Sequence, residues 1–258
     1  MSGKRPLILV GNDDSIHARG IHYLIDFISE FGDIVVCAPE THQSGMSSAI
    51  TCTRVLQLRE YPDYNGAKMY SVDGTPVDAI KVAVNCLLKQ KPDFVITGIN
   101  HGPNYGNSAL YSGTMGAAFE GAIMDIPAIG FSYLGMAEDA DMSSCRETVQ
   151  MLMRKALNGE IEKGMCLNVN IPDTGKVLGT KVVRPAKGYW DEEFKEGVII
   201  DGHRTFALTG QYINLEPERT DTDLAVIAEG YASVTPLRPD QTAIDRLDHY
   251  AKLFDTKL

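Results

Sequence analysis

Two adjacent aspartates, Asp13 and Asp14, follow a short run of aliphatic residues near the N-terminus. The run, at residues 7–10, reads Leu-Ile-Leu-Val and is typical of a β-strand buried on both faces. Ligands of open α/β sheets bind at the carboxyl ends of the strands, where these carboxylates would lie. Because neighbouring carboxylates repel each other, the pair predicts a divalent cation. A polar turn that caps the next helix is the alternative.

Two further oxygen-bearing side chains follow predicted strands. Ser44 comes shortly after the strand at residues 34–39, and Asn100 ends the strand that starts at residue 94. The ends of parallel strands share one edge of a sheet, so these groups could converge with the aspartates. An all-oxygen set suits Mg²⁺ or Mn²⁺. Taken singly, each could be a turn or capping residue, so the prediction depends on the three strand ends together.

A third feature is the entry into a helix rich in small residues. Ser112, Gly113 and Thr114 precede Ala117 and Ala118. Free backbone N–H groups and hydroxyls at a helix N-terminus form a phosphate-binding cradle. An ordinary Ser or Thr N-cap is the alternative. The sequence has no Walker-type lysine loop and no Gly-x-Gly-x-x-Gly after the first strand, which argues against dinucleotide binding.

The elements that position these residues alternate between strand and helix in the first part of the chain. Strand 7–10, a helix with an apolar stripe from Ile21 to Phe31, and strand 34–39 predict a parallel right-handed crossover. Asn65-Gly66 predicts a hairpin turn. The other predicted helices cover residues 76–90, 114–124 and 143–157, and the other strands cover 94–100, 128–132 and 167–172. After about residue 175 the sequence changes to short strands, at 181–184 and 232–235, followed by a helix near 241–254.

Composition narrows the class of protein. The chain has 258 residues and a formal net charge of −10, which argues against binding to a nucleic-acid polymer. No stretch approaches membrane-spanning length, and the first apolar run is too short for a signal peptide. Five scattered cysteines without paired spacing are typical of reduced thiols and predict a cytoplasmic protein without a zinc site.

An ordered series of motifs resembles the SurE (survival protein E) family of metal-dependent nucleotidases. The motifs are Ile8 to Asp14, Ala38-Pro39 with Gln43-Ser44-Gly45, Ser48 to Thr51, Gly74-Thr75-Pro76, Thr97 to Asn104, Tyr111 to Thr114, Thr222-Asp223 and Gly230 to Leu237. They extend over nearly the whole chain, which makes a chance match implausible.

The resemblance implies a Rossmann-like α/β core at residues 1–178, with a mostly parallel sheet and helices on both faces. It also implies a β-rich C-terminal arm and terminal helix at residues 179–258, through which subunits form dimers or tetramers. The implied activity is hydrolysis of nucleoside 5′-monophosphates, with 3′-nucleotides and short polyphosphate as further substrates. The family's metal ligands carry over as Asp13, Asp14, Ser44 and Asn100, which hold one divalent cation per subunit.

In the mechanism that follows, Asp13 and Asp14 are catalytic, and Asn104 and the 112–114 turn bind the phosphate. His42 and His101 are candidate acids for the leaving oxygen, although a position on the surface or behind the residues that touch the substrate is the favoured interpretation for each. Asp13 as a covalent phosphoryl acceptor is a less favoured route, because adjacent aspartates point in different directions. A non-catalytic nucleotide-binding regulatory protein is the alternative from another class.

Two residues depart from the family pattern. Gly11 stands where the family usually has Thr, and Ser15 where it usually has Gly. If position 15 needs a positive φ, Ser15 would be strained. Neither change removes a predicted ligand. The role of Trp190, as a base-stacking or a packing residue, stays open.

Overall fold

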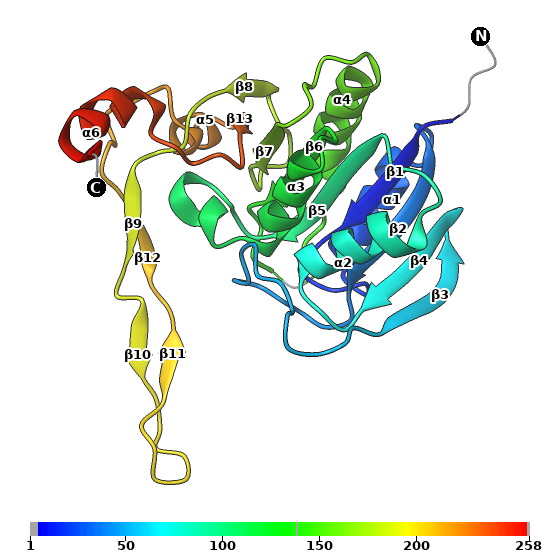
Figure 1. Cartoon of the computed structure of the whole chain (residues 1–258), viewed down its shortest axis with the longest axis horizontal. Helices are drawn as coiled ribbons and strands as arrows, with labels where there is room; N and C mark the ends of the chain where they lie inside the picture. The colour runs from blue at the N-terminus through cyan, green and yellow to red at the C-terminus, as the bar shows by residue number, and fades with distance from the viewer. Residues whose placement is uncertain (1–4, 138, 257–258) are drawn as a thin grey trace.

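A nine-stranded sheet organises the structure, a computed structural model that describes residues 5–137 and 139–256. The strand order is β3-β4-β2-β1-β5-β6-β7-β13-β8 (Figure 1). The strands are β1 Leu7–Gly11, β2 Asp33–Pro39, β3 Leu58–Tyr64, β4 Ala67–Val72, β5 Phe94–His101, β6 Ala128–Tyr133, β7 Cys166–Ile171, β8 Thr180–Val182 and β13 Ala232–Leu237. The strands from β4 to β7 in this order run parallel, whereas β3 and β13 are antiparallel to their neighbours β4 and β7. The predicted α/β fold is confirmed.

Helices cover both faces of this sheet. They are α1 Arg19–Ile28, α2 Pro76–Val82, α3 Gly113–Ile123 and α4 Arg146–Leu157. One apolar core contains residues of α1 and α4 and the other contains residues of α2 and α3. The predicted stripe on α1 is correct, because Ile21, Leu24 and Ile25 are all fully buried. β1 and β2 pair in parallel on either side of α1 in the sequence, as the predicted crossover requires.

The turn between β3 and β4 and the end of α2 can be compared with the predictions from the sequence. Asn65 and Gly66, with φ of 46° and 81°, form the predicted turn between β3 and β4. The helix predicted over residues 76–90 is shorter, because α2 ends at Val82 and a π-helical turn, Ala83–Leu87, closes it. In that turn the Asn85 side chain donates to the Lys81 carbonyl (2.8 Å), and Leu88 is already extended. A polar side chain that competes for a backbone carbonyl explains the early end.

The C-terminal part of the chain has two components. β8 and β13 join the main sheet, so the division at residue 178 stays a prediction. Residues 188–214 form a long hairpin that extends away from the sheet in Figure 1 and is called the arm here. Its strands are β9 Gly188–Asp191, β10 Phe194–Glu196, β11 Phe206–Leu208 and β12 Gln211–Asn214. Helix α6, Leu247–Phe254, confirms the predicted C-terminal helix, whereas α5, Asp223–Ala228, was not predicted.

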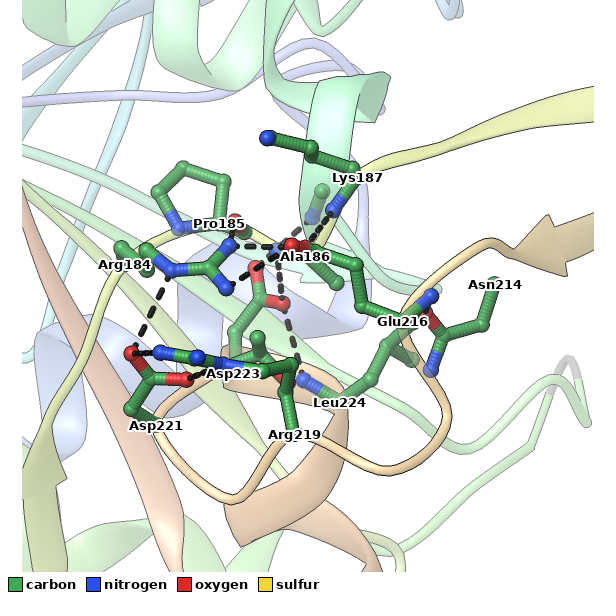
Figure 2. Close-up of polar contacts among 12 residues, drawn as sticks. Arg184, Pro185, Ala186, Lys187, Asn214, Glu216, Arg219, Asp221, Asp223 and Leu224 are labelled. Carbon is green, nitrogen blue, oxygen red and sulfur yellow. Dashed lines mark hydrogen bonds and ion pairs between the residues drawn. The ribbon is translucent and has the colours of Figure 1, made fainter.

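A polar network holds the base of the arm (Figure 2). Arg184 makes a bidentate pair with Glu216, with N–O distances of 2.8 and 3.0 Å, and so joins the chain before β9 to the chain after β12. Asp223 is fully buried and accepts hydrogen bonds from the backbone N–H groups of Gly106 (2.7 Å), Ala186 (2.9 Å) and Leu224 (2.8 Å). Asp223 therefore ties the segment just before the arm, at Ala186, to the 3₁₀ turn Gly106–Leu110.

Candidate active site

The carboxyl ends of three adjacent strands carry the predicted metal ligands. β2, β1 and β5 are neighbours in the sheet. Asp13 and Asp14 follow β1, Ser44 follows β2, and Asn100 lies at the end of β5. The Gln43 backbone N–H donates to the Asp13 carbonyl (2.7 Å), which fixes the loop after β2 against the loop after β1. The predicted convergence at one sheet edge is therefore present.

A cavity of about 480 Å³ opens at this edge. Its lining includes the predicted site residues Asp13, Ser44, Asn100, Asn104 and Ser112. The volume is that of a pocket for a small organic ligand. Sequence reasoning left the role of Trp190 open, and the structure places Trp190 in the wall of this cavity as well.

Asp13 is almost fully buried, with 2% of its surface exposed. Burial and the neighbouring charge of Asp14 raise the pKa of Asp13 from 3.8 to about 6, although the Thr114 hydroxyl partly opposes the shift. That hydroxyl donates to Asp13 Oδ1 at 2.5 Å. A carboxylate in this setting is poorly neutralised by the protein alone, so its oxygen is available to a cation.

Asp14 faces different surroundings from Asp13. It lines a second cavity, of about 540 Å³, together with His42 and His101. Its Oδ1 lies 3.4 Å from His42 Nδ1, and its Oδ2 accepts the His101 backbone N–H at 3.1 Å. Burial raises the pKa of Asp14, and these two partners oppose the rise. Ser44 lines both cavities and so lies between the two carboxylates.

Asn100 is nearly buried, with 7% exposure. Its side-chain nitrogen donates to the Gly102 carbonyl at 2.8 Å, which fixes the orientation of the amide. The amide oxygen is thus the atom left for a cation, as the predicted oxygen set requires.

The 112–114 turn contributes in three different ways. Ser112 Oγ accepts the Met115 backbone N–H (3.1 Å), so it caps α3 and also lines the cavity. Gly113 lies against Asp13, because a Cβ there would be 2.8 Å from the Asp13 Cβ. Thr114 is fully buried and reaches the site through its bond to Asp13. Direct contact of the Thr114 hydroxyl with a phosphate stays a prediction.

Asn104 is held by polar groups that sequence reasoning missed. Its backbone N–H donates to Asn170 Oδ1 (2.7 Å), and its carbonyl accepts from Asn168 Nδ2 (2.7 Å). Its side-chain nitrogen donates to Ser132 Oγ at 2.8 Å. The available signal was Asn168-Val169-Asn170, two amides on one face of an otherwise apolar strand.

The two departures from the family pattern have structural correlates. Ser15 has a φ of 101°, so the strain expected for a non-glycine residue at this position is present. At Gly11 a Cβ would lie 3.0 Å from Ile80 Cδ1 and 3.2 Å from the Cys37 carbonyl oxygen. Ile80 therefore occupies the room that a larger residue at position 11 would need.

The donor set fits a hard cation. In the part of the chain that the structure describes, no group of three or more His, Cys, Asp or Glu side chains could hold a metal ion. A cation at this edge would therefore depend on Ser44 and Asn100 as well as on the carboxylates. Oxygen donors of this kind suit a hard divalent cation better than zinc, which prefers nitrogen and sulfur ligands.

Within residues 5–137 and 139–256, no helix is both long enough and apolar enough to cross a bilayer.

Comparisons with known proteins match nearly the whole chain. The family described as "Survival protein SurE" matches residues 8–192. A protein of Christiangramia forsetii named 5′-nucleotidase SurE is 42% identical over 94% of this chain and 95% of its own length. One of the same name from Bacteroides thetaiotaomicron is 39% identical, with 98% of each chain covered. The crystal structure of the SurE protein from Aquifex aeolicus superposes with a TM-score of 0.82, at 33% identity and with 97% and 100% of the two chains covered. This chain belongs to the SurE family.

Proposed function

We propose that this chain is a metal-dependent 5′-nucleotidase, which hydrolyses nucleoside 5′-monophosphates to nucleoside and phosphate. The observation that carries the proposal is the meeting of Asp13, Ser44 and Asn100 in one cavity with Asn104 and Ser112. The relatives named 5′-nucleotidase SurE support the same activity.

Asp13, Asp14, Ser44 and Asn100 would hold one Mg²⁺ or Mn²⁺ per subunit. When bound, the cation would supply Lewis-acid polarisation of the phosphoryl oxygens and of a water molecule. Thr114 holds the Asp13 carboxylate in one orientation through its 2.5 Å hydrogen bond.

Residues of the chain bind the phosphate and orient the attacking water. Ser112 and Asn104 bind the phosphoryl oxygens, and Gly113 lets the start of α3 approach Asp13 closely. Asp14 orients the attacking water, because it lines the second cavity and is less deeply buried than Asp13. Preorganised donors of this kind stabilise the charge that develops on the phosphoryl group.

His101 and His42 are the candidate acids for the leaving oxygen. Both line the cavity that contains Asp14, and His101 Nε2 is buried, with no hydrogen-bond partner among the described residues. Covalent attack by Asp13 is less favoured. Asp13 and Asp14 face different cavities, whereas the covalent route needs two carboxylates on the same side.

Dimers or tetramers, formed through residues 179–258, are the proposed assembly, with residues 1–178 as the catalytic core. Exposed apolar side chains support this proposal, since large exposed patches mark interaction surfaces. On the arm Val198 and Ile199 are 75% and 70% exposed, and on α6 Leu253 and Phe254 are 58% and 70% exposed. A cytoplasmic location is proposed from the five free cysteines.

The deciding experiment is phosphate release from nucleoside 5′-monophosphates, first in EDTA and then with added Mg²⁺ or Mn²⁺. Release that is absent in EDTA and restored by a metal is expected. 3′-Nucleotides and short polyphosphate form the second panel. If protein with a native circular-dichroism spectrum releases no phosphate with either metal, the assignment as a hydrolase is overturned. A nucleotide-binding regulatory protein would then be favoured.

A further inference from the structure

We infer that the nucleobase stacks on Trp190 in this cavity. The arm then contacts the base while the sheet edge holds the phosphate. The inference rests on the proposed nucleotidase function and assigns one part of the substrate to one part of the cavity. Trp190 is the only tryptophan of the chain.

The cavity has walls from two different parts of the molecule. The sheet edge and the loops beside it contribute the polar residues Asp13, Ser44 and Asn100. The arm contributes the apolar side chains of Trp190 and Leu208, together with the polar residues Glu193 and Thr209. Figure 1 shows the arm starting beside the 106–110 turn, and β9 and this turn are in contact. A phosphate needs only the polar wall, so the aromatic wall points to an apolar, planar group on the same ligand.

The indole of Trp190 is held in place before any ligand binds. Its Nε1–H donates to Ser108 Oγ at 3.2 Å. Trp190 is the direct cross-strand partner of Tyr212, and their rings meet edge to face, 5.8 Å apart at 81°. Tyr212 packs in the same way on Tyr105, at 5.4 Å. A preorganised ring loses little conformational entropy on binding, which favours a role in recognition.

A nucleobase is the planar group that a nucleoside monophosphate supplies. Aromatic side chains stack on every base, since each base presents a π-face. The predicted contact is therefore tolerant of base identity, and it separates nucleotides from sugar phosphates that lack a base.

Tyr189 is the matched control residue. It is the neighbour of Trp190 on β9, is 46% exposed, and is not part of the cavity lining. Successive side chains of a strand point to opposite faces, so replacement of Tyr189 disturbs the same strand without changing this wall.

The test compares Trp190→Ala, Trp190→Phe and Tyr189→Ala on two substrates, adenosine 5′-monophosphate and ribose 5-phosphate. For Trp190→Ala we expect kcat/KM for the nucleotide to fall about 10-fold or more, mainly through KM. Trp190→Phe keeps a stacking ring and should restore most of the loss. Ribose 5-phosphate should be hydrolysed equally by all variants. Equal losses on both substrates, or the same loss in Tyr189→Ala, would overturn the inference.

A binding measurement on the wild-type protein keeps the test independent of turnover and of variant folding. Titration with adenosine should change the intrinsic tryptophan fluorescence, which only Trp190 provides, and titration with ribose should not. Unchanged fluorescence at adenosine concentrations that inhibit the enzyme would overturn the inference. Absence of phosphate release from either substrate would overturn the proposed function instead, and the fluorescence result would still decide the base contact.

Discussion

Two runs of three aliphatic residues differ in their exposure to solvent, one being buried and the other exposed. Ile8, Leu9 and Val10 on β1 are fully buried between β2 and β5. Val198, Ile199 and Ile200 near the end of the arm are 75%, 70% and 55% exposed. Similar residues thus build the centre of the sheet in one region and an open surface in the other.

The two regions differ in what covers their apolar residues. Around β1 the burial of apolar residues lets the fold hold two carboxylates at one edge, including one that is almost completely desolvated. On the arm, equally apolar residues have no cover within the described chain. The apolar residues of the sheet edge are therefore covered in the folded chain, whereas the arm exposes apolar surface that the proposed assembly would bury.

The largest expected effect comes from the desolvated carboxylate. Replacing Asp13 by Asn removes the negative charge of a proposed cation ligand while keeping the size of the side chain. We expect turnover to fall at least ~10³-fold at saturating metal, a loss typical of essential catalytic groups. A loss of affinity with unchanged turnover would contradict the catalytic role of Asp13.

The same substitution should stabilise the metal-free protein. Because the pKa of Asp13 is raised to about 6 in the folded state, its ionised form is disfavoured by folding. Metal-free stability should fall as the pH rises from about 4 to about 6 and stay low above that range. In EDTA at pH 7, Asp13→Asn should therefore unfold with a free energy higher by ~1–3 kcal/mol. Denaturant titrations at pH 4 and pH 7 measure this, and a gain that is equal at both pH values would contradict the charge explanation.

The arm should show the next largest effect. Changing Val198, Ile199 and Ile200 together to Ser removes three apolar side chains from the proposed interface. We expect the dissociation constant of the assembly to rise by ~100-fold or more, since each buried side chain of this kind contributes ~1.5–3 kcal/mol. Light scattering across a concentration series measures it. An unchanged dissociation constant would show that the subunits associate elsewhere. A triple change of β1 residues is not a suitable control, because it would unfold the core.

Asp223 offers a smaller effect at the junction of the two regions. Asn has one acceptor oxygen, so Asp223→Asn cannot accept all three backbone N–H groups. We expect a loss of ~2–3 kcal/mol in unfolding free energy. Arg184→Met is the matched comparison, since it breaks a partly exposed ion pair at the same junction and should cost ~1 kcal/mol or less. Equal losses of unfolding free energy in the two variants would mean that the burial of Asp223 adds nothing to its contribution to stability.

The smallest effect concerns backbone strain in each region. Ser15 beside the site has a φ of 101°, and Asp201 on the arm has a φ of 50°. Ser15→Gly should stabilise the protein by ~0.5–1 kcal/mol, because glycine adopts positive φ without steric cost. Asp201→Gly should gain less, since Asp tolerates the left-handed region. Thermal unfolding of both variants makes the comparison, and a larger gain at Asp201 would contradict it.

Sequence reasoning predicted the sheet edge better than the arm for a physical reason. At the edge, the aliphatic run and the following polar residues are local signals, and parallel pairing then brings Asp13, Ser44 and Asn100 together. The cavity wall at Trp190 depends on where the arm lies, which no local pattern encodes. Helix α5 was missed because the capping signal at Thr222, whose Oγ accepts the Ala225 N–H, lies in a segment read as β-rich. The support of Asn104 by Asn168 and Asn170 likewise depends on a contact between distant segments.

The arm that lines the cavity is one uninterrupted segment, residues 188–214, anchored at its base. Substrate choice in this family could then diverge by change within that segment alone, while the catalytic edge of the sheet stays constant. For an engineer, a library confined to the arm would alter how strongly the enzyme prefers nucleotides to sugar phosphates that lack a base, without altering how the ester is cleaved. A hairpin exchanged between relatives would act as a cassette that transfers preference from one enzyme to another.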